Sequence, residues 1–473
     1  MKKKIYQIII HAVVAITAVS CTKYLDVEPK SSLSENEMFA SELGFDQALS
    51  GVYATLAARS LYGDNMTMGF TAALAQNYAT SGLGSLFVDT RAYNYSSTEF
   101  TRYASSIWTS AYNTIASVNN ILKFAESNRN VLSTSAYQQI TGEAYAIRAL
   151  LHFDLLRLFA PSFASNTNGI GIPYRKTIDQ NPTAALSITE IIDNVLEDLD
   201  IAETLLKELD PIFDNTMQRR FKMNYYAIKG LQARVYHYKG EEKQAYDAAK
   251  VIVDSQQFPF VATSSVNTTI AGTKDRLFMS ELVFALRNRN IGAWAVNSYF
   301  TILINSRFSL TRPLADLSAI YEGNTNDLRY ANLFENSSNV LISSKFWQTS
   351  TSEIDSLRLD RMVPVIRMSE MCYILAETAP TEDEALDHLN RIRNARHLVD
   401  LPKNSNTLNR IFIQDEITKE YQKEFYAEGQ LFLYYKRKDM NQFQFSPANF
   451  SKSAYVLPTP ELEKEFNLNY QSP

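Results

Sequence analysis

Apolar residues recur every three to four positions over most of this 473-residue chain, the spacing that places them on one face of an α-helix. The clearest case lies between residues 107 and 124, where Ile107, Ile115 and Val118 share one face. Ser187 and Glu190 have the spacing of a capping box, so a helix is expected to begin there. Helices are predicted from residue 45 onward and over residues 107–124, 137–159, 187–209, 224–239, 241–255, 365–377, 382–396 and 410–435.

One predicted helix pair resembles a tetratricopeptide unit. Ala233 and Ala245 are small enough to let two antiparallel helices approach, Tyr236 fills the space between them, and Gly240 forms the turn. Residues 373–392 repeat this pattern weakly, and the irregular spacing argues against a plain repeat array. The predicted fold is therefore mainly α, with tetratricopeptide-like helix pairs forming a helical scaffold decorated by long irregular loops. Two stretches, residues 60–103 and 256–362, are predicted to be non-helical, and long loops on a rigid scaffold usually carry function.

The start of the chain has the features of a secretory signal. Three lysines precede an apolar stretch, residues 5–19, which is shorter than the ~20 residues that a membrane-spanning helix needs. Ala18-Val19-Ser20-Cys21 resembles a bacterial lipobox, whose cysteine is acylated, and the alternative is an ordinary secretory signal with an incidental cysteine. We expect a signal peptide over residues 1–20, lipidation at Cys21 and a polar tether over residues 22–36. Acylation of Cys21 leaves Cys372 without a disulfide partner, so Cys372 is expected to be a small buried hydrophobe.

Composition and motifs indicate which classes of function the chain can have. The net charge of −5 and the absence of a basic patch argue against nucleic-acid binding. His152, His237, His388 and His397 show no metal-ligand spacing, no G-x-S-x-G motif is present, and no metal or cofactor is expected. With 51 acidic residues, a glycosidase-like carboxylate pair is not excluded by sequence alone. We therefore predict a binding protein rather than an enzyme, with a tetratricopeptide scaffold that binds a partner protein as a further alternative.

Four motifs resemble, in the same order, those of the SusD/RagB family of nutrient-binding outer-membrane lipoproteins. They are the helix around Glu143, Arg148 and Arg157, residues 366–393, residues 420–437 and the closing Leu457-Pro458-Thr459-Pro460-Glu461. The resemblance implies an N-terminal region over residues 21–238, a C-terminal region over residues 270–473 and a fold with four tetratricopeptide-like helix pairs. It also implies a lipid-anchored position in the outer membrane facing the cell exterior. The expected partner is a TonB-dependent, SusC-type barrel, to which the protein would present glycans or, alternatively, peptides.

The motif residues themselves are predicted to have structural roles. Glu416, Glu420, Glu424 and Glu428 recur at every fourth position, a spacing that suits either a solvated stripe moderated by Lys419 and Lys423 or ion pairs between helices. These motifs therefore identify the family without forming its binding site.

Candidate ligand-binding residues come from the two predicted loop regions. A glycan site needs flat apolar faces for sugar rings and planar polar groups for hydroxyls. The resemblance places ligands at loops in about these regions, whereas Trp108 follows a helical pattern and is excluded as a core residue. The predicted ligand-binding residues are Tyr78, Arg91, Tyr93, Tyr95, Arg289, Trp294, Tyr299 and Trp347.

Overall fold

The computed structural model describes residues 34–79, 85–179, 181–214, 217–270, 272–301, 309–337, 339–348, 361–403 and 408–467. The predicted signal peptide and Cys21 lie outside this part of the chain, and the predicted tether overlaps α2, which begins at Glu35. The α-helices are α2 (Glu35–Met38), α3 (Glu42–Leu56), α4 (Phe70–Leu74), α5 (Val88–Arg91), α6 (Thr98–Ser127), α7 (Thr134–Phe159), α8 (Ile188–Leu206), α9 (Tyr225–Lys239), α10 (Glu242–Asp254), α11 (Thr263–Val266), α12 (Ile291–Ser298), α13 (Leu314–Ile320), α14 (Leu328–Asn332), α15 (Met368–Thr378), α16 (Glu382–Ala395), α17 (Arg410–Glu424), α18 (Gln430–Arg437) and α19 (Glu461–Phe466). The strands are β1 (Ile170–Pro173), β2 (Ala185–Ser187), β3 (Leu282–Arg287), β4 (Thr311–Pro313), β5 (Phe334–Ser337), β6 (Val340–Ser343) and β7 (Met362–Arg367).

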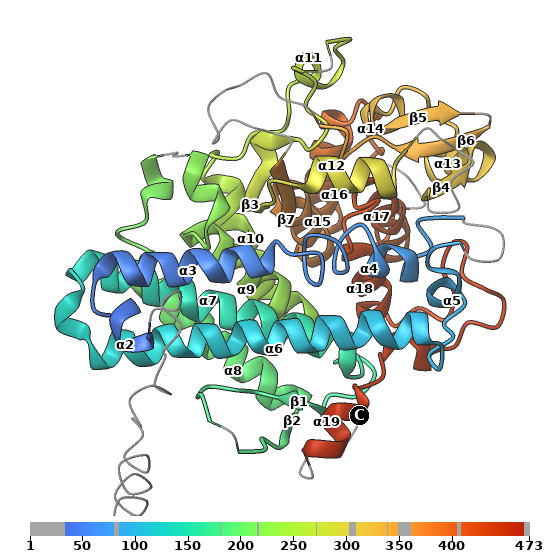
Figure 1. Cartoon of the computed structure of the whole chain (residues 1–473). Helices are drawn as coiled ribbons and strands as arrows, with labels where there is room; N and C mark the ends of the chain where they lie inside the picture. The colour runs from blue at the N-terminus through green and yellow to red at the C-terminus, as the bar shows by residue number, and fades with distance from the viewer. Residues whose placement is uncertain are drawn as a thin grey trace, which may run out of the picture.

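The long helices form the scaffold, and the predicted mainly α, tetratricopeptide-like fold is confirmed. Helices α3 and α6 run side by side across one face, with α7 to α10 behind them, and the C-terminal helices α15 to α18 pack at one end (Figure 1). Sequence-adjacent helices pack against each other in the pairs α7–α8, α9–α10 and α15–α16, and α15 also packs against α10. The scaffold therefore joins the N-terminal and C-terminal parts of the chain.

Local sequence sets the helix boundaries. Ser187 caps α8 in the predicted capping box, in which its hydroxyl accepts a hydrogen bond from Glu190 N and the Glu190 carboxylate accepts one from Ser187 N. Gly240 ends α9 in the left-handed conformation, with φ of 80°. Ala233 and Ala245 are fully buried, and α9 packs directly on α10. The predicted tetratricopeptide-like pair is confirmed.

Two helix predictions were wrong in part. The predicted helix 365–377 begins as strand β7, because Pro364 and the β-branched residues around it favour an extended chain that pairs with β3. The predicted helix 410–435 is interrupted between α17 and α18, where Ala427 and Gly429 have positive φ. Tertiary hydrogen bonds replace the helical ones there, since the Tyr426 hydroxyl donates to Asn77 O at 2.6 Å and Ala427 N donates to Asn77 Oδ1 at 3.0 Å.

The two stretches predicted as non-helical contain short elements. The first contains α4, α5 and the first turns of α6, and the second contains α11 to α14 and strands β3 to β6, with β7 at its end. β3 pairs antiparallel with β7, and β1 pairs antiparallel with β2. A separate three-stranded antiparallel sheet has the strand order β4, β6, β5. Elements this short escape a periodicity search, because three to eight residues cover too few turns to show a repeat.

The glutamates of the C-terminal motif are buried in ion pairs. Glu424 accepts hydrogen bonds from Arg329, Arg367 and Arg396, and all four side chains are at most 3% exposed. Burial raises the pKa of Glu424, but Arg396 and Arg367 hold it well below its ordinary value. Of the two structural roles predicted for these glutamates, the ion pair between helices is the one found for Glu420 and Glu424.

Other predicted core residues are confirmed. Trp108 packs against Phe159 and Tyr112, with ring centroids 4.9 Å apart in each pair. Cys372 is fully buried, and burial raises the pKa of its thiol to about 12. His152 is also buried, which lowers its pKa to about 3, so the neutral ring donates from Nδ1 to Arg148 O and accepts from Arg175 N. No helix in the described ranges is long and apolar enough to span a membrane.

Candidate functional site

Tyr299 is the centre of a cluster formed by residues distant in sequence. It follows α12 directly and its hydroxyl donates to Asp64 Oδ2 at 3.0 Å. Arg59, in the turn after α3, also donates to Asp64 Oδ2, from Nε at 3.0 Å and from Nη2 at 2.9 Å. Its guanidinium lies 4.3 Å from the centroid of the Trp294 ring. One buried carboxylate thus fixes an arginine between two aromatic rings.

The polar groups of this cluster are incompletely satisfied. Asp64 is 2% exposed, and burial raises its pKa to about 6 even though Arg59 lowers it. Asp64 Oδ1 and Trp294 Nε1 are both buried, and neither has a hydrogen-bond partner among the described residues. Buried polar atoms without partners are costly, and they are common where a ligand or water completes the bonding.

The cluster continues along the first turns of α6. Phe87 contacts both Tyr299 and Tyr103, with ring centroids 6.0 Å and 5.1 Å away respectively. The exposed Arg102 lies 4.5 Å from the centroid of the Tyr103 ring. We name Arg59, Arg102, Tyr103, Trp294 and Tyr299 the aromatic–arginine patch. Two arginines and the half-buried rings of Tyr103 and Trp294 are its accessible groups.

The patch contains two of the predicted ligand-binding residues, Trp294 and Tyr299. Tyr299 is only 3% exposed, so it positions Arg59 and Trp294 rather than offering a face of its own. Tyr78 is completely buried, and its hydroxyl donates to Met68 O at 2.6 Å. Its ring has no face for a ligand, so we remove Tyr78 from the candidate site. Trp347 is half-buried and donates from Nε1 to Phe300 O at 2.6 Å, which fixes the backbone next to Tyr299.

The other predicted residues lie elsewhere. Tyr93 and Tyr95 are half-buried and pack toward the C-terminal segment, where Tyr93 contacts Phe450 and the Tyr95 hydroxyl donates to Ala454 O. The half-buried Arg91 has its carbonyl oxygen bonded by Gln76 Nε2 at 2.8 Å. Arg289 is exposed in the turn that precedes α12. Of the eight predicted residues, the structure therefore places Trp294 and Tyr299 in the patch, Tyr93 and Tyr95 beside the C-terminal segment, and the other four in neither group.

A groove lies between α6 and the C-terminal segment, and it connects the two groups. Its free volume is about 780 Å³, which is within the range of small-molecule sites. Tyr95 lines it, Arg102 of the patch lines it from α6, and the C-terminal side is formed by residues 458–463. Threonine and serine residues of α6 also line it, namely Thr98, Thr101, Ser105 and Thr109. Flat rings beside hydroxyl and guanidinium groups suit a ligand with many hydroxyls.

Sequence reasoning missed Arg59, Asp64 and Tyr103. Arg59 lies just beyond an amphipathic helix and 240 residues before Tyr299, so no local spacing connects them. Asp64 is one of 51 acidic residues, and only its burial beside Arg59 distinguishes it. In the described part of the chain, no group of three or more histidine, cysteine, aspartate or glutamate side chains could hold a metal ion.

Comparison with known proteins was made for sequence and for structure. Residues 23–236 match a family described as starch-binding and associating with the outer membrane, and residues 319–463 match the SusD family. A SusD superfamily protein from Bacteroides thetaiotaomicron VPI-5482 has a TM-score of 0.72 at 22% identity, covering 92% of this chain and 100% of its own. A SusD-like carbohydrate-binding protein from Bacteroides vulgatus ATCC 8482 has a TM-score of 0.71 at 14% identity, covering 91% and 97%. No curated protein matched the sequence.

Proposed function

The chain belongs to the SusD/RagB family, and on that premise we propose that it is a cell-surface lipoprotein that binds glycans and delivers them to a TonB-dependent, SusC-type outer-membrane transporter. The family is associated with the outer membrane. Acylation at Cys21 would hold the protein there. The transporter is the partner that a lipid-anchored binding protein of this family needs for uptake.

The main support for glycan binding is the aromatic–arginine patch. A sugar ring can lie on the exposed part of the Trp294 indole, while its hydroxyls meet the exposed guanidinium of Arg59. Arg59 is already oriented by two hydrogen bonds to Asp64, so little side-chain freedom is lost on binding. The groove along α6 would take the rest of an oligosaccharide, with Arg102 between the two.

Binding measurements on single variants test the site. A glycan array identifies the ligand, and calorimetry then compares wild type with Trp294→Ala and Arg102→Ala. Loss of one stacking face should cost about 1–3 kcal/mol, a weakening of the dissociation constant of roughly 5- to 150-fold. Tyr137→Ala is the matched control, because Tyr137 also carries an arginine over its ring, Arg129 at 4.1 Å, but lies beyond the opposite end of α6.

The outcomes separate the alternatives. Wild-type affinity in Trp294→Ala would move the site away from the patch. Binding to peptides, with no glycan bound on the array, would favour the peptide-binding lid, since Arg59 and Arg102 can also pair with carboxylates. Release of reducing ends by purified protein, abolished by a carboxylate variant, would contradict a purely binding role.

Anchoring and partnership are tested in membranes. Cys21→Ala should abolish labelling with a fatty-acid analogue and move the protein out of the outer-membrane fraction. Tagged wild-type protein, purified from detergent-solubilised outer membranes, should bring a TonB-dependent barrel with it. Unchanged labelling of Cys21→Ala, or purification without a barrel, would contradict the anchor or the partner respectively.

A further inference from the structure

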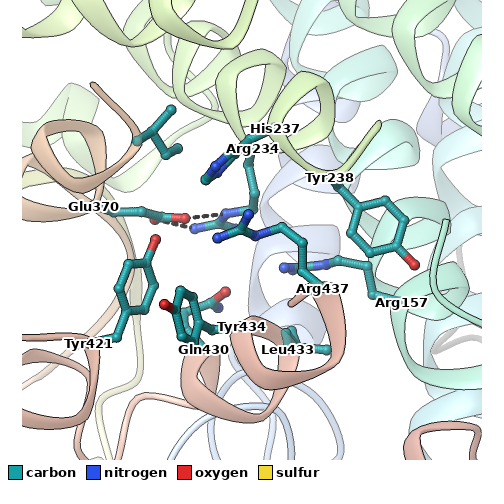
Figure 2. Close-up of a pocket in the computed structure, with 11 residues that line it drawn as sticks. Arg157, Arg234, His237, Tyr238, Glu370, Tyr421, Gln430, Leu433, Tyr434 and Arg437 are labelled. Carbon is teal, nitrogen blue, oxygen red and sulfur yellow. Dashed lines mark hydrogen bonds and ion pairs between the residues drawn. The ribbon is translucent and has the colours of Figure 1, made fainter. Parts of the chain in front are cut away.

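A small polar pocket lies where the N-terminal and C-terminal helices meet, away from the aromatic–arginine patch. Arg157 reaches it from α7, Arg234 from α9, and Arg437 and Gln430 from α18 (Figure 2). Three arginines line this pocket, against one carboxylate, that of Glu370. Such a concentration of like charge in a buried place needs compensation.

Each of the three arginines is paired with a carboxylate. Glu370 accepts from Arg234 Nε at 2.7 Å and from Arg234 Nη2 at 2.6 Å. Arg157 is paired with Asp154, and Arg437 donates twice to Glu377, at 2.7 Å and 2.9 Å. The ion pairs fix the guanidinium groups, and Arg234 Nη2 also donates to Val365 O at 2.9 Å.

Two N–H donors of these arginines have no partner among the described residues. Arg157 Nε and Arg234 Nη1 are buried and make no hydrogen bond to any described residue, and both side chains are at least nine-tenths buried. Figure 2 shows the side chains of Arg157, Arg234 and Arg437 converging on one space. An unmade hydrogen bond at a buried cation is among the costlier defects in a folded protein.

We propose that this pocket binds one small monovalent anion of halide size, such as chloride. A water molecule that accepted both N–H groups would also have to donate its own two protons in a pocket lined by three arginines, where each oxygen of Glu370 already accepts one hydrogen bond from Arg234. An anion needs only donors. The free volume of about 30 Å³ is enough for one or two water-sized particles, a size that suits a single halide ion.

The bound ion would join two parts of the chain. Arg157 and Arg234 lie in the segment that matches the outer-membrane starch-binding family, whereas Gln430 and Arg437 lie in the segment that matches the SusD family. An anion accepting hydrogen bonds from Arg157 and Arg234 beside Arg437 stabilises their packing. This site is independent of the proposed glycan site.

Diffraction tests occupancy directly. Crystals grown in sodium bromide should show an anomalous peak within hydrogen-bond distance of Arg157 Nε and Arg234 Nη1. Water density in the pocket without a bromide peak would overturn the proposal.

Thermal unfolding tests binding in solution. Titration with sodium chloride against sodium gluconate at equal ionic strength should raise the melting temperature saturably, by about 3 °C at a hundredfold excess over Kd for a chain of this size. Gln430→Glu places a carboxylate at the pocket and should abolish this chloride response, because the tethered charge replaces the ion. Gln244→Glu is the control, since Gln244 is exposed in the first turn of α10 and should leave the response intact. A full chloride response in Gln430→Glu, or equal melting temperatures of the wild type in the two salts, would overturn the proposal.

Discussion

Glu424 should be among the most stabilising single side chains in the protein. Its Oε2 accepts from Arg329 Nη1 at 2.9 Å and from Arg396 Nε at 3.0 Å, and its Oε1 accepts from Arg396 Nη2 at 2.7 Å and from Arg367 Nη1 at 2.6 Å. The substitution Glu424→Gln keeps the size of the side chain but turns one of these acceptors into an NH₂ group that faces two N–H donors. It also leaves three buried arginines short of one negative charge.

Breaking a buried ion pair by removing one partner costs about 3–5 kcal/mol. With an unfolding entropy of ~2.1 cal/mol/K per residue, a chain of this length should lose about 3–5 °C in melting temperature. The pKa of Glu424 is lower in the folded protein than in the unfolded chain. Its ionised carboxylate therefore stabilises the fold fully above the pKa of the unfolded chain, and this stabilisation is lost as the pH falls through the pKa of the folded protein. The difference between wild type and variant should therefore be full at pH 7 and shrink below about pH 4.

Urea denaturation and calorimetry at pH 7 measure the effect. Glu461→Gln serves as the control, because the Glu461 side chain is 87% exposed and should change stability by less than about 0.5 kcal/mol. A loss for Glu424→Gln as small as that of the control would refute the reasoning, since it would mean that the three arginines are compensated without this carboxylate.

Three further predictions follow from buried groups. Lys436 Nζ donates to Arg157 O at 2.6 Å and to Ala160 O at 2.5 Å, so Lys436→Met, which leaves both carbonyls without this donor, should cost about 2–4 kcal/mol in denaturant unfolding. An unchanged denaturation midpoint would contradict this. Gly429→Ala should destabilise the protein by at least about 2 kcal/mol, because φ is +79° and an added Cβ would lie 2.1 Å from Met66 O. The control is Gly51→Ala inside α3, where an added Cβ meets open space and should stabilise the protein by about 0.5–1 kcal/mol. Equal melting temperatures for these two variants would contradict the assigned strain. Burial raises the pKa of Asp64 to about 6, so the contribution of its protonation to folding stability is full below pH 4 and is lost as the pH rises through 6. Asp64→Asn should therefore flatten the fall of the melting temperature between pH 4 and 7. An unaltered pH profile would contradict the raised pKa of Asp64.

The scaffold could be predicted from sequence because long helices with one buried face display their period over several turns. The helix that contains Ile107 and Val118 and the capping box at Ser187 are read from neighbouring residues alone. The predictions failed where distant contacts decide the conformation. The backbone at Gly429 lies against Met66, and Ile366 of β7 fits against the bare Cα of Gly230, where an added Cβ would be 2.9 Å from Ile366 Cγ2.

The candidate site was harder to predict than the fold, because aromatic residues in loops serve both the core and the surface. Tyr78 and Trp294 look alike as members of polar, aromatic stretches, yet only Trp294 is partly exposed. Trp294 is a candidate binding residue because the Arg59 guanidinium lies against its ring, and Asp64 holds that guanidinium in place by hydrogen bonds. No spacing rule relates these three residues.

The contact between Arg234 and Glu370 can form only late in synthesis of the chain. Glu370 follows Arg234 by 136 residues, and Lys436 follows Arg157, whose carbonyl it binds, by 279. A nascent chain therefore presents Arg234 without its carboxylate partner and α7 without the lysine at its end until most of the polypeptide has emerged. The N-terminal helices cannot complete their native packing as an early, independent folding unit, so a fragment that stops near residue 240 should populate an aggregation-prone intermediate rather than a stable half.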